Sequence, residues 1–265
     1  ERGPRLASRE DEDVSELVAE RFRLEGIRVL TEHKVVAVDQ YARDKVVICE
    51  HKGQKVKIPC DEILVAVGRT ANTDGLGLEA LGIELNPNRT LKVDPYLRVP
   101  NYPHILGCGD VAGPYQFTHV AAHQAWYASV NGLFAPFKKF RVDYSVIPWA
   151  TFTDPEVARV GLNEQDAKAQ NIPYEVVKYG IDDLDRAIAD EEAHGFVKVL
   201  TKPGSDRILG VTIVGAHAGD LIAKYVLAMK HGLGLNKLLG TIHIYPTFNE
   251  ANKYAAGEWK RAHKP

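Results

Sequence analysis

The sequence is poor in cysteine. Its three cysteines, Cys49, Cys60 and Cys108, are scattered over 265 residues without a CxxC or CxxxxC spacing. A structural zinc site needs four close nitrogen or sulfur ligands, which this arrangement does not offer. Few cysteines in a long chain also disfavour a disulfide framework and suit a reducing compartment. We therefore interpret the thiols as structural and expect no metal site.

The sequence also lacks an excess of charge and long apolar runs. It has 33 basic and 35 acidic residues, for a net charge of -2. This balance gives no reason to expect nucleic acid or an anionic membrane as a partner. No apolar run approaches the roughly 20 residues of a membrane span, and no signal peptide is recognisable. We expect a cytoplasmic protein of about two domains.

The first part of the sequence has the pattern of an α/β protein. Residues 10–25 place Val14, Val18 and Phe22 on one helical face, which predicts a helix. Three strand-like runs follow, at 27–40, 45–52 and 54–62. Residues 63–67, "ILVAV", then predict a strand buried on both faces of a parallel sheet.

A second apolar stretch, at 101–110, ends in Gly109 and Asp110, and a helical pattern covers 118–134. In open α/β sheets, ligands bind beyond the carboxyl ends of the strands. A carboxylate there can accept hydrogen bonds from a ribose or polyol, and the helix amides can face an anionic or carbonyl group. A simple strand-end turn capped by Asp110 is the alternative, and a Gly-Asp pair alone leaves both interpretations open.

From residue 141 onward the pattern becomes that of an α+β domain. Residues 142–162 are rich in strand signals, and 195–215 read as a β-hairpin. Helical patterns follow at 219–232 and after Pro246. We therefore predict an antiparallel sheet packed with helices.

Residues 241–253, "TIHIYPTFNEANK", change from an alternating to a helical pattern at Pro246. The Thr-x-x-Glu spacing that ends at Glu250 is that of a capping box, in which the glutamate binds a backbone amide. The stretch is therefore either a well-capped helix start or a catalytic lip that carries His243, Tyr245 and Glu250.

Two other polar groups match ligand sites only in part. His119 and His123 share a helix face, but no third metal ligand lies near them in the sequence. The acid-rich stretch 181–192 lacks the glycine and the terminal glutamate of a calcium loop. We interpret that stretch as a solvated surface segment.

Four motifs in a fixed order give the sequence a family resemblance: "ILVAVGRTANTDGLGLEALGIEL", "VPNYPHILGCGDVAG", "IPWATFTDPEVARVGL" and "YPTFNEANK". Together they resemble the FAD-dependent pyridine nucleotide-disulfide oxidoreductases, in particular the dihydrolipoamide dehydrogenase-like and mercuric reductase-like members. The resemblance covers essentially the whole chain. It implies an α/β remnant of nucleotide-binding domains, followed by an α+β interface domain with an antiparallel sheet.

The family order implies a layout in three parts. Residues 1–64 resemble the latter part of the NAD(P)-binding domain, and residues 65–140 the returning part of the FAD-binding domain. Residues 141–265 resemble the interface domain that forms the homodimer. The apolar helix residues Leu221, Ile222, Tyr225, Val226, Ala228 and Met229 exceed what one helix face needs. Core packing alone could explain them, but the resemblance favours a dimer face.

The resemblance assigns flavin contacts to one turn and one helix start. Asp110, beside Gly109, matches the family's aspartate that binds the flavin ribityl chain. Phe117, Thr118 and His119 would face the pyrimidine edge of the flavin.

Three further residues come from other parts of the chain. Arg69, after Gly68, either holds an anion or pairs with a neighbouring carboxylate. Glu1 stands where an acidic residue of the family holds the ribose hydroxyls of the nicotinamide cofactor, which favours NADH over NADPH.

Disulfide-reducing members of the family carry a His-Pro pair near the C-terminus, with a Glu four residues after the proline. There the histidine acts as acid and base across the dimer interface, and the glutamate orients it. Pro246 and Glu250 match this motif, but Tyr245 takes the histidine position. Tyrosine titrates near pH ~10 and is a poor base at neutral pH, although it can donate a hydrogen bond. Mercuric reductase-like members also lack this histidine, and nearby His243 is a hypothetical substitute.

The implied function is that of the C-terminal portion of an oxidoreductase. It would pass electrons from NAD(P)H through FAD to a disulfide or another small-molecule acceptor. Two alternatives stay open: a non-catalytic dimerisation or interaction module on the same fold, and a flavin reductase or oxidase that uses no disulfide.

The 265-residue chain alone is expected to be inactive. The phosphate-binding glycine loop, the redox-active cysteine pair and the GxGxxG motif of the family precede the matched region and are not found here. We predict that the purified chain, incubated with FAD and desalted, retains no stoichiometric flavin absorbance and consumes no NADH. A yellow one-to-one flavin complex would contradict this prediction.

Overall fold

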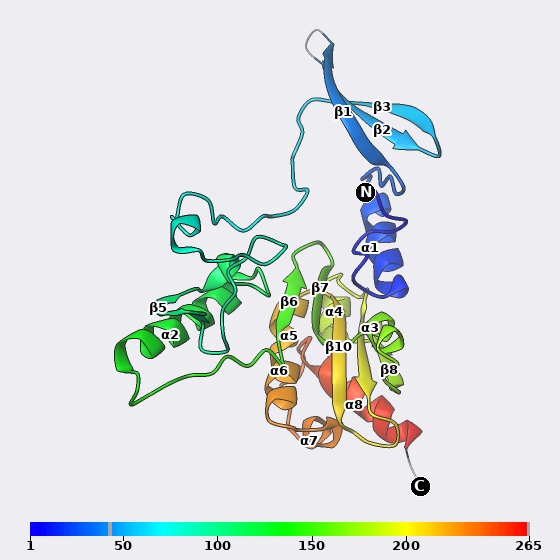
Figure 1. Ribbon diagram of the computed structural model, residues 1–265. Helices are drawn as coiled ribbons and strands as arrows, with labels where there is room; N and C mark the ends of the chain where they lie inside the picture. The colour runs from blue at the N-terminus through cyan, green and yellow to red at the C-terminus, as the bar shows by residue number, and fades with distance from the viewer. Residues whose placement is uncertain (42–43, 264–265) are drawn as a thin grey trace. The chain divides into compact units, whose positions relative to one another are not determined.

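The computed structural model describes residues 1–41 and 44–263, and the chain divides into two compact units. Unit 1 combines Glu1–Leu64 with Ser145–Pro265, and unit 2 is Val65–Tyr144. Figure 1 labels most helices and strands of both units. Within the described residues, none of the helices has both the length and the apolar character that crossing a bilayer requires.

Unit 1 is built around a five-stranded sheet in which every pair of neighbours is antiparallel. The predicted hairpin is present as β9 and β10, which confirms an antiparallel interface-domain sheet. In sheet order the strands are β6 (Pro148–Thr151), β7 (Glu156–Gly161), β10 (Ile208–Gly215), β9 (Phe196–Thr201) and β8 (Glu175–Gly180).

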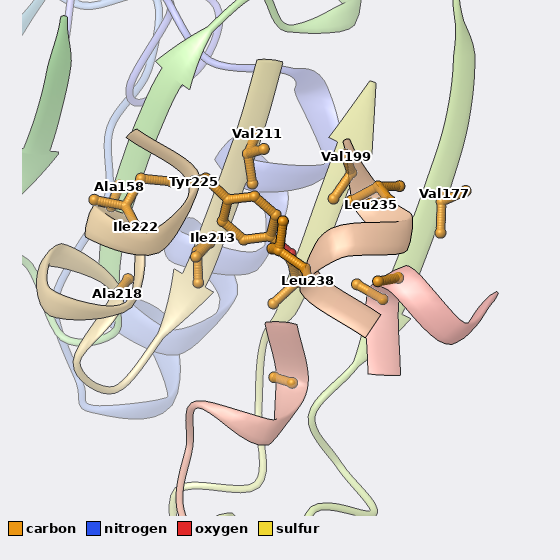
Figure 2. Packing of buried hydrophobic residues seen from close by; sticks show 14 of the residues in the cluster. Ala158, Val177, Val199, Val211, Ile213, Ala218, Ile222, Tyr225, Leu235 and Leu238 are labelled. Carbon is orange, nitrogen blue, oxygen red and sulfur yellow. The ribbon is translucent and has the colours of Figure 1, made fainter. Parts of the chain in front are cut away.

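One face of this sheet packs on helices and forms the main core (Figure 2). Side chains alternate between the faces of a strand, so Val197 and Val199 of β9 share the core face with Val211 and Ile213 of β10. Tyr225 fills the space above them and is fully buried. The helices that contribute to this core are α4 (Asp185–Ala189), α5 (Ala218–Leu221), α6 (Ala223–Lys230), α7 (Leu235–Leu239) and α8 (Glu250–Ala262), whereas α3 (Glu164–Ala169) pairs with charged residues of the opposite face.

The opposite face of the sheet carries apolar and charged residues and is contacted by α1 (Glu12–Leu24). Phe196 and Val214 pack there against Val14 and Val18. Between these apolar contacts, Lys198 of β9 is only 2% exposed. A lysine this buried has to be paired, because an isolated charge is costly in the interior.

Three carboxylates surround the Lys198 ammonium. Its Nζ lies 2.8 Å from Asp11, 2.7 Å from Asp13 and 3.3 Å from Glu164. Burial by itself lowers the pKa of Lys198, but the hydrogen bonds and charges of Asp11 and Asp13 outweigh it and raise that pKa.

Arg159 of β7 repeats this arrangement on the same sheet face. Its Nε lies 3.0 Å from Glu10, and its guanidinium stacks 4.4 Å from the Trp149 ring centre. Arg159 also pairs with Asp166, so the counter-ions of the sheet come from the acidic residues just before and within α1 and from Glu164 and Asp166 of α3.

The rest of unit 1 is a three-stranded antiparallel meander: β1 (Lys34–Tyr41), β2 (Asp44–His51) and β3 (Gln54–Cys60). It corresponds to the three strand-like runs of the sequence, although residues 27–33 are not part of a strand.

Unit 2 combines a small hairpin with one long helix. The hairpin strands are β4 (Arg98–Val99) and β5 (Tyr102–Leu106), and the helix is α2 (Thr118–Phe134), with the predicted bounds. Two short 3-10 helices, η1 (Glu79–Leu81) and η2 (Gly109–Val111), complete it. Leu78, Ile83, Leu91 and Val99 form its core.

Two predictions from apolar patterns are wrong. Residues 63–67 form no strand, and Val65 and Val67 are 76% and 93% exposed. A strand buried in a parallel sheet needs partners on both sides, and none of the described strands pairs with this run. The other wrong prediction is the dimer face on α6, because Ile222, Tyr225 and Ala228 are core residues of the same chain.

We predict that Lys198→Ala destabilises the chain by about 3–5 kcal/mol, because it leaves buried carboxylates facing one another without their cation. Urea unfolding followed by circular dichroism measures the change. Lys168, 69% exposed and 3.7 Å from Glu164, provides the control. Lys168→Ala is expected to cost less than about 0.5 kcal/mol, and an equal loss in both variants would contradict the prediction.

Candidate functional site

The Gly109-Asp110 turn of unit 2 is held in place by a buried glutamine of α2, Gln124. Gly109 has φ +74°, and a Cβ there would lie 3.3 Å from the Cβ of Ala121, so both backbone and space favour glycine. Its amide donates a 2.6 Å hydrogen bond to Oε1 of Gln124. Gln124 is 1% exposed and donates in turn to the Gly113 carbonyl and the Tyr144 hydroxyl. The glutamine fixes the turn against α2.

Asp110 itself stays accessible in this turn. Its side chain is 42% exposed, and one carboxylate oxygen lies 3.8 Å from Nη1 of Arg69, which is 67% exposed. Arg69 also donates to the Gln116 carbonyl at 3.3 Å. Arg69 therefore pairs with a neighbouring carboxylate, one of the two roles considered for it. An ion pair this open contributes little stability, and the carboxylate can accept hydrogen bonds from a ligand.

Aromatic rings line the start of α2. Thr118 is its first residue, and Phe117 precedes it in extended conformation. The Phe117 ring stacks on His119 at 5.2 Å and on Tyr115 at 6.2 Å between centroids. Gly68, with φ +130°, completes the predicted cofactor residues of unit 2.

In unit 1, Tyr245 is held by a residue outside its motif. Its hydroxyl donates a 2.8 Å hydrogen bond to Oδ2 of Asp185, the first residue of α4. This hydrogen bond and the charge of Asp185 raise the pKa of Tyr245. The ring is 66% exposed. Tyr245 is thus a protonated, accessible hydroxyl rather than a base.

Glu250 is used locally, and its charge also contributes, less than Asp185, to raising the pKa of Tyr245. It is 7% exposed, its Oε2 accepts the Thr247 amide at 3.2 Å, and its Oε1 accepts the Tyr254 hydroxyl at 3.3 Å. The Thr247 hydroxyl donates to the Ile244 carbonyl at 2.7 Å. Of the two hydrogen bonds that define the predicted capping box, only the one that Glu250 accepts from the Thr247 amide is therefore formed.

His243 lies in an irregular segment before Pro246. The strand that the alternation predicts is not formed there, because the segment has no strand partner among the described residues. Its Nδ1 is 2.7 Å from the Thr241 carbonyl, so we assign the proton to Nδ1. Burial, with Lys224 and Lys253 nearby, lowers the pKa of His243, so the ring is neutral at pH 7. Its Nε2 is enclosed and has no hydrogen-bond partner within the described chain.

Glu1 also lies in unit 1. Its Oε1 accepts the Gly3 amide at 2.6 Å, and its backbone carbonyl accepts the amide of His33. The carboxylate is therefore part of a local turn.

Comparisons with known proteins bear on both regions. A model described as "Pyridine nucleotide-disulphide oxidoreductase" matches residues 1–125, and the model of that family's dimerisation domain matches residues 147–256. The chain belongs to the pyridine nucleotide-disulfide oxidoreductase family. The resemblance and the fold class that it implies are thereby confirmed.

Two kinds of relative, dihydrolipoyl dehydrogenases and mercuric reductases, align with nearly the whole chain. It is 32% identical over 240 residues to a dihydrolipoyl dehydrogenase of Chlamydia pneumoniae, which is 91% of this chain and 50% of that protein. It is 33% identical over 256 residues to a mercuric reductase of Acidithiobacillus ferrooxidans, 97% of this chain and 45% of that protein. The chain spans about half the length of such relatives.

Solved structures agree in fold. The HOCl-induced flavoprotein disulfide reductase RclA of Escherichia coli aligns with a TM-score of 0.87 at 24% identity, over 97% of this chain and 58% of that one. LpdA of Mycobacterium tuberculosis aligns with a TM-score of 0.83 at 25% identity, over 96% and 54%.

The sequence-based reasoning missed the residues that hold the predicted ones. Gln124 could have been noticed as a polar residue on an apolar helix face. Asp185 lies in the acid-rich stretch that we interpreted as solvated, where Asp183 similarly accepts the Tyr179 hydroxyl at 2.8 Å. That interpretation is incomplete, because these carboxylates bind tyrosines. Only the folded chain brings them together.

We predict that Asp185→Asn lowers the pKa of Tyr245 toward the ordinary value of 10.0, since the variant removes the acceptor charge that raises it. NMR titration of ring-labelled tyrosine measures the change. Asp190→Asn is the control, since Asp190 pairs with Arg186 in the same helix region. An unchanged titration of Tyr245 in Asp185→Asn would show that the contact does not control it.

Proposed function

We propose that the chain forms the C-terminal portion of an oxidoreductase that passes electrons from NAD(P)H through FAD to a disulfide or another small-molecule acceptor. The Gly109-Asp110 turn carries the proposal, since it keeps a half-exposed carboxylate beside the amide end of α2. Family membership and the names of the relatives support it. In this proposal residues 1–64 belong to the nicotinamide side, 65–140 to the flavin side and 141–265 to the interface.

The residues of unit 2 suit a flavin. FAD, when bound, supplies the group that accepts a hydride from the nicotinamide and passes electrons on. Asp110 would accept hydrogen bonds from the hydroxyls of its polyol chain, and the lack of a side chain at Gly109 leaves room beside it. The backbone amides at Thr118 and His119 would donate to a carbonyl edge.

We propose a homodimer formed through residues 141–265. The segment before Pro246 has no regular secondary structure and leaves Ile242 and Ile244 96% and 77% exposed. Two neighbouring exposed isoleucines are costly in water and suit burial against a partner subunit. With the family's dimerisation model over 147–256, this segment replaces α6 as the proposed dimer face. We also assign the protein to the cytoplasm, as its cysteine usage favours.

Tyr245 is the proposed donor to the electron acceptor. Asp185 orients its hydroxyl and keeps it protonated. It can therefore hydrogen-bond an acceptor but cannot take a proton from a dithiol at neutral pH. Glu250 would hold the segment around Pro246 in place through its hydrogen bond from the Thr247 amide. His243 would help to position the same segment. This chemistry favours an acceptor other than dihydrolipoamide.

The nicotinamide preference rests on Glu1. Its Oε1 is engaged by Gly3, and a carboxylate at this place would accept the ribose hydroxyls of NADH and repel the extra phosphate of NADPH.

The test is an acceptor screen of the longer protein that contains this chain, with NADH and NADPH as donors. Disulfides, Hg²⁺ and quinones are compared as acceptors. We predict that Tyr245→Phe lowers turnover about tenfold or more with the preferred acceptor, while flavin reduction by the nicotinamide, followed by stopped flow, is unchanged.

Tyr174→Phe is the matched control, because Tyr174 bonds Glu164 in another part of unit 1. Full activity of Tyr245→Phe would exclude the proposed role of the hydroxyl. A dimer that binds neither flavin nor nicotinamide would favour the non-catalytic module instead.

A further inference from the structure

Three potential metal ligands converge at one end of the five-stranded sheet, within unit 1. One ligand atom each from Asp154, Glu192 and His194 lies within 4.8 Å of the other two. Asp154 is exposed, whereas Glu192 and His194 are partly buried.

The sheet topology brings these residues together. β7 and β9 flank β10 and are both antiparallel to it, so both begin where β10 ends at Gly215. Asp154 precedes β7, and Glu192 and His194 precede β9. A Cβ on Gly195, at φ +126°, would clash with a carbonyl of β10, so only glycine lets this loop close over the end of that strand.

A tight turn directs two of the ligands to the same point. The His194 amide donates to the Glu192 carbonyl at 2.8 Å. Their side-chain atoms, Nε2 and Oε2, lie 3.2 Å apart. Ligands that bind Zn²⁺ tetrahedrally at 2.0–2.2 Å stand roughly 3.3 Å or slightly more from one another. The pair is thus spaced as two ligands of one ion.

These two atoms lack hydrogen bonds although they are enclosed. Neither Nε2 of His194 nor Oε2 of Glu192 has a hydrogen-bond partner within residues 1–41 and 44–263, and both are inaccessible to solvent. Buried polar atoms are normally satisfied, so at 3.2 Å these two either form an ion pair with each other or share a bound cation.

We propose that Asp154, Glu192 and His194 bind a divalent transition metal ion, with Zn²⁺ as the best fit. Imidazole nitrogen and carboxylate oxygen are both zinc ligands, and these three residues would leave one position of a four-coordinate ion for water. Calcium prefers six to eight oxygens, which this group does not supply. The site departs from the expectation of no metal, which rested on ligand spacing along the sequence.

The ion would tie the loop before β7 to the loop before β9. Because it binds the folded chain and joins segments that are far apart in sequence, it would stabilise that fold. The proposal is independent of the flavin and of the electron acceptor.

A His194–Glu192 ion pair is the competing explanation. A variant at Asp154 distinguishes the ion pair from the metal site. The ion pair does not need Asp154, whereas the metal site does. Asp154 is exposed, so Asp154→Asn is not expected to affect folding.

The experiment uses the 265-residue chain, stripped with EDTA and dialysed. Zn²⁺ is added during thermal unfolding and calorimetric titration, and Co²⁺ is added in parallel for its visible absorption. We expect one ion per chain, a rise in Tm of about 5 °C or more at a hundredfold excess over Kd, and a tetrahedral Co²⁺ spectrum.

Asp154→Asn and His194→Ala should each lose the Tm rise and the Co²⁺ spectrum. His231→Ala, which removes an exposed histidine at the end of α6, should keep both. The proposal is overturned if wild type shows no Tm rise with Zn²⁺, if Asp154→Asn responds like wild type, or if His231→Ala also loses the response.

Discussion

The fold of unit 1 depends on neutralising two cations inside it. Lys198 and Arg159 point from neighbouring parts of the sheet toward α1, where water cannot solvate them. The carboxylates that pair with them are Glu10, Asp11 and Asp13, near the start of the chain, and Glu164 and Asp166 of α3. If α1 docked elsewhere, each buried cation would keep one partner on α3 and lose those that precede or begin α1. Charge pairing therefore specifies this packing, while apolar burial supplies much of the stability.

Both candidate regions share a principle of construction. A residue of a recognisable motif is held by a residue outside that motif: Gly109 by Gln124, and Tyr245 by Asp185. Glu250, to which the resemblance assigns the orienting role, instead hydrogen-bonds the backbone of its own helix start. The hydroxyl of Tyr245 is held by Asp185, which lies on a different helix.

Much of the fold follows from the sequence. Periodicity located α2 to the residue and found the β9–β10 hairpin, because both depend on neighbours in the chain. The buried strand at 63–67 was wrong because burial depends on partners that a pattern cannot supply. The contact between Tyr245 and Asp185 could not be predicted for a related reason, because it joins residues that are 60 positions apart in the sequence. The roles of Asp110, Tyr245, Glu250 and His243 stay predictions that geometry makes specific.

The exposed run at 63–67 has a consequence for handling the chain. It is apolar, uncharged and free of proline, and it holds the β-branched residues that favour strands. With Val65 and Val67 mostly open to water, its backbone is a template on which a second molecule can add a strand. We therefore expect strand addition at this run, rather than the free energy of folding, to limit the concentration at which the isolated chain stays monodisperse.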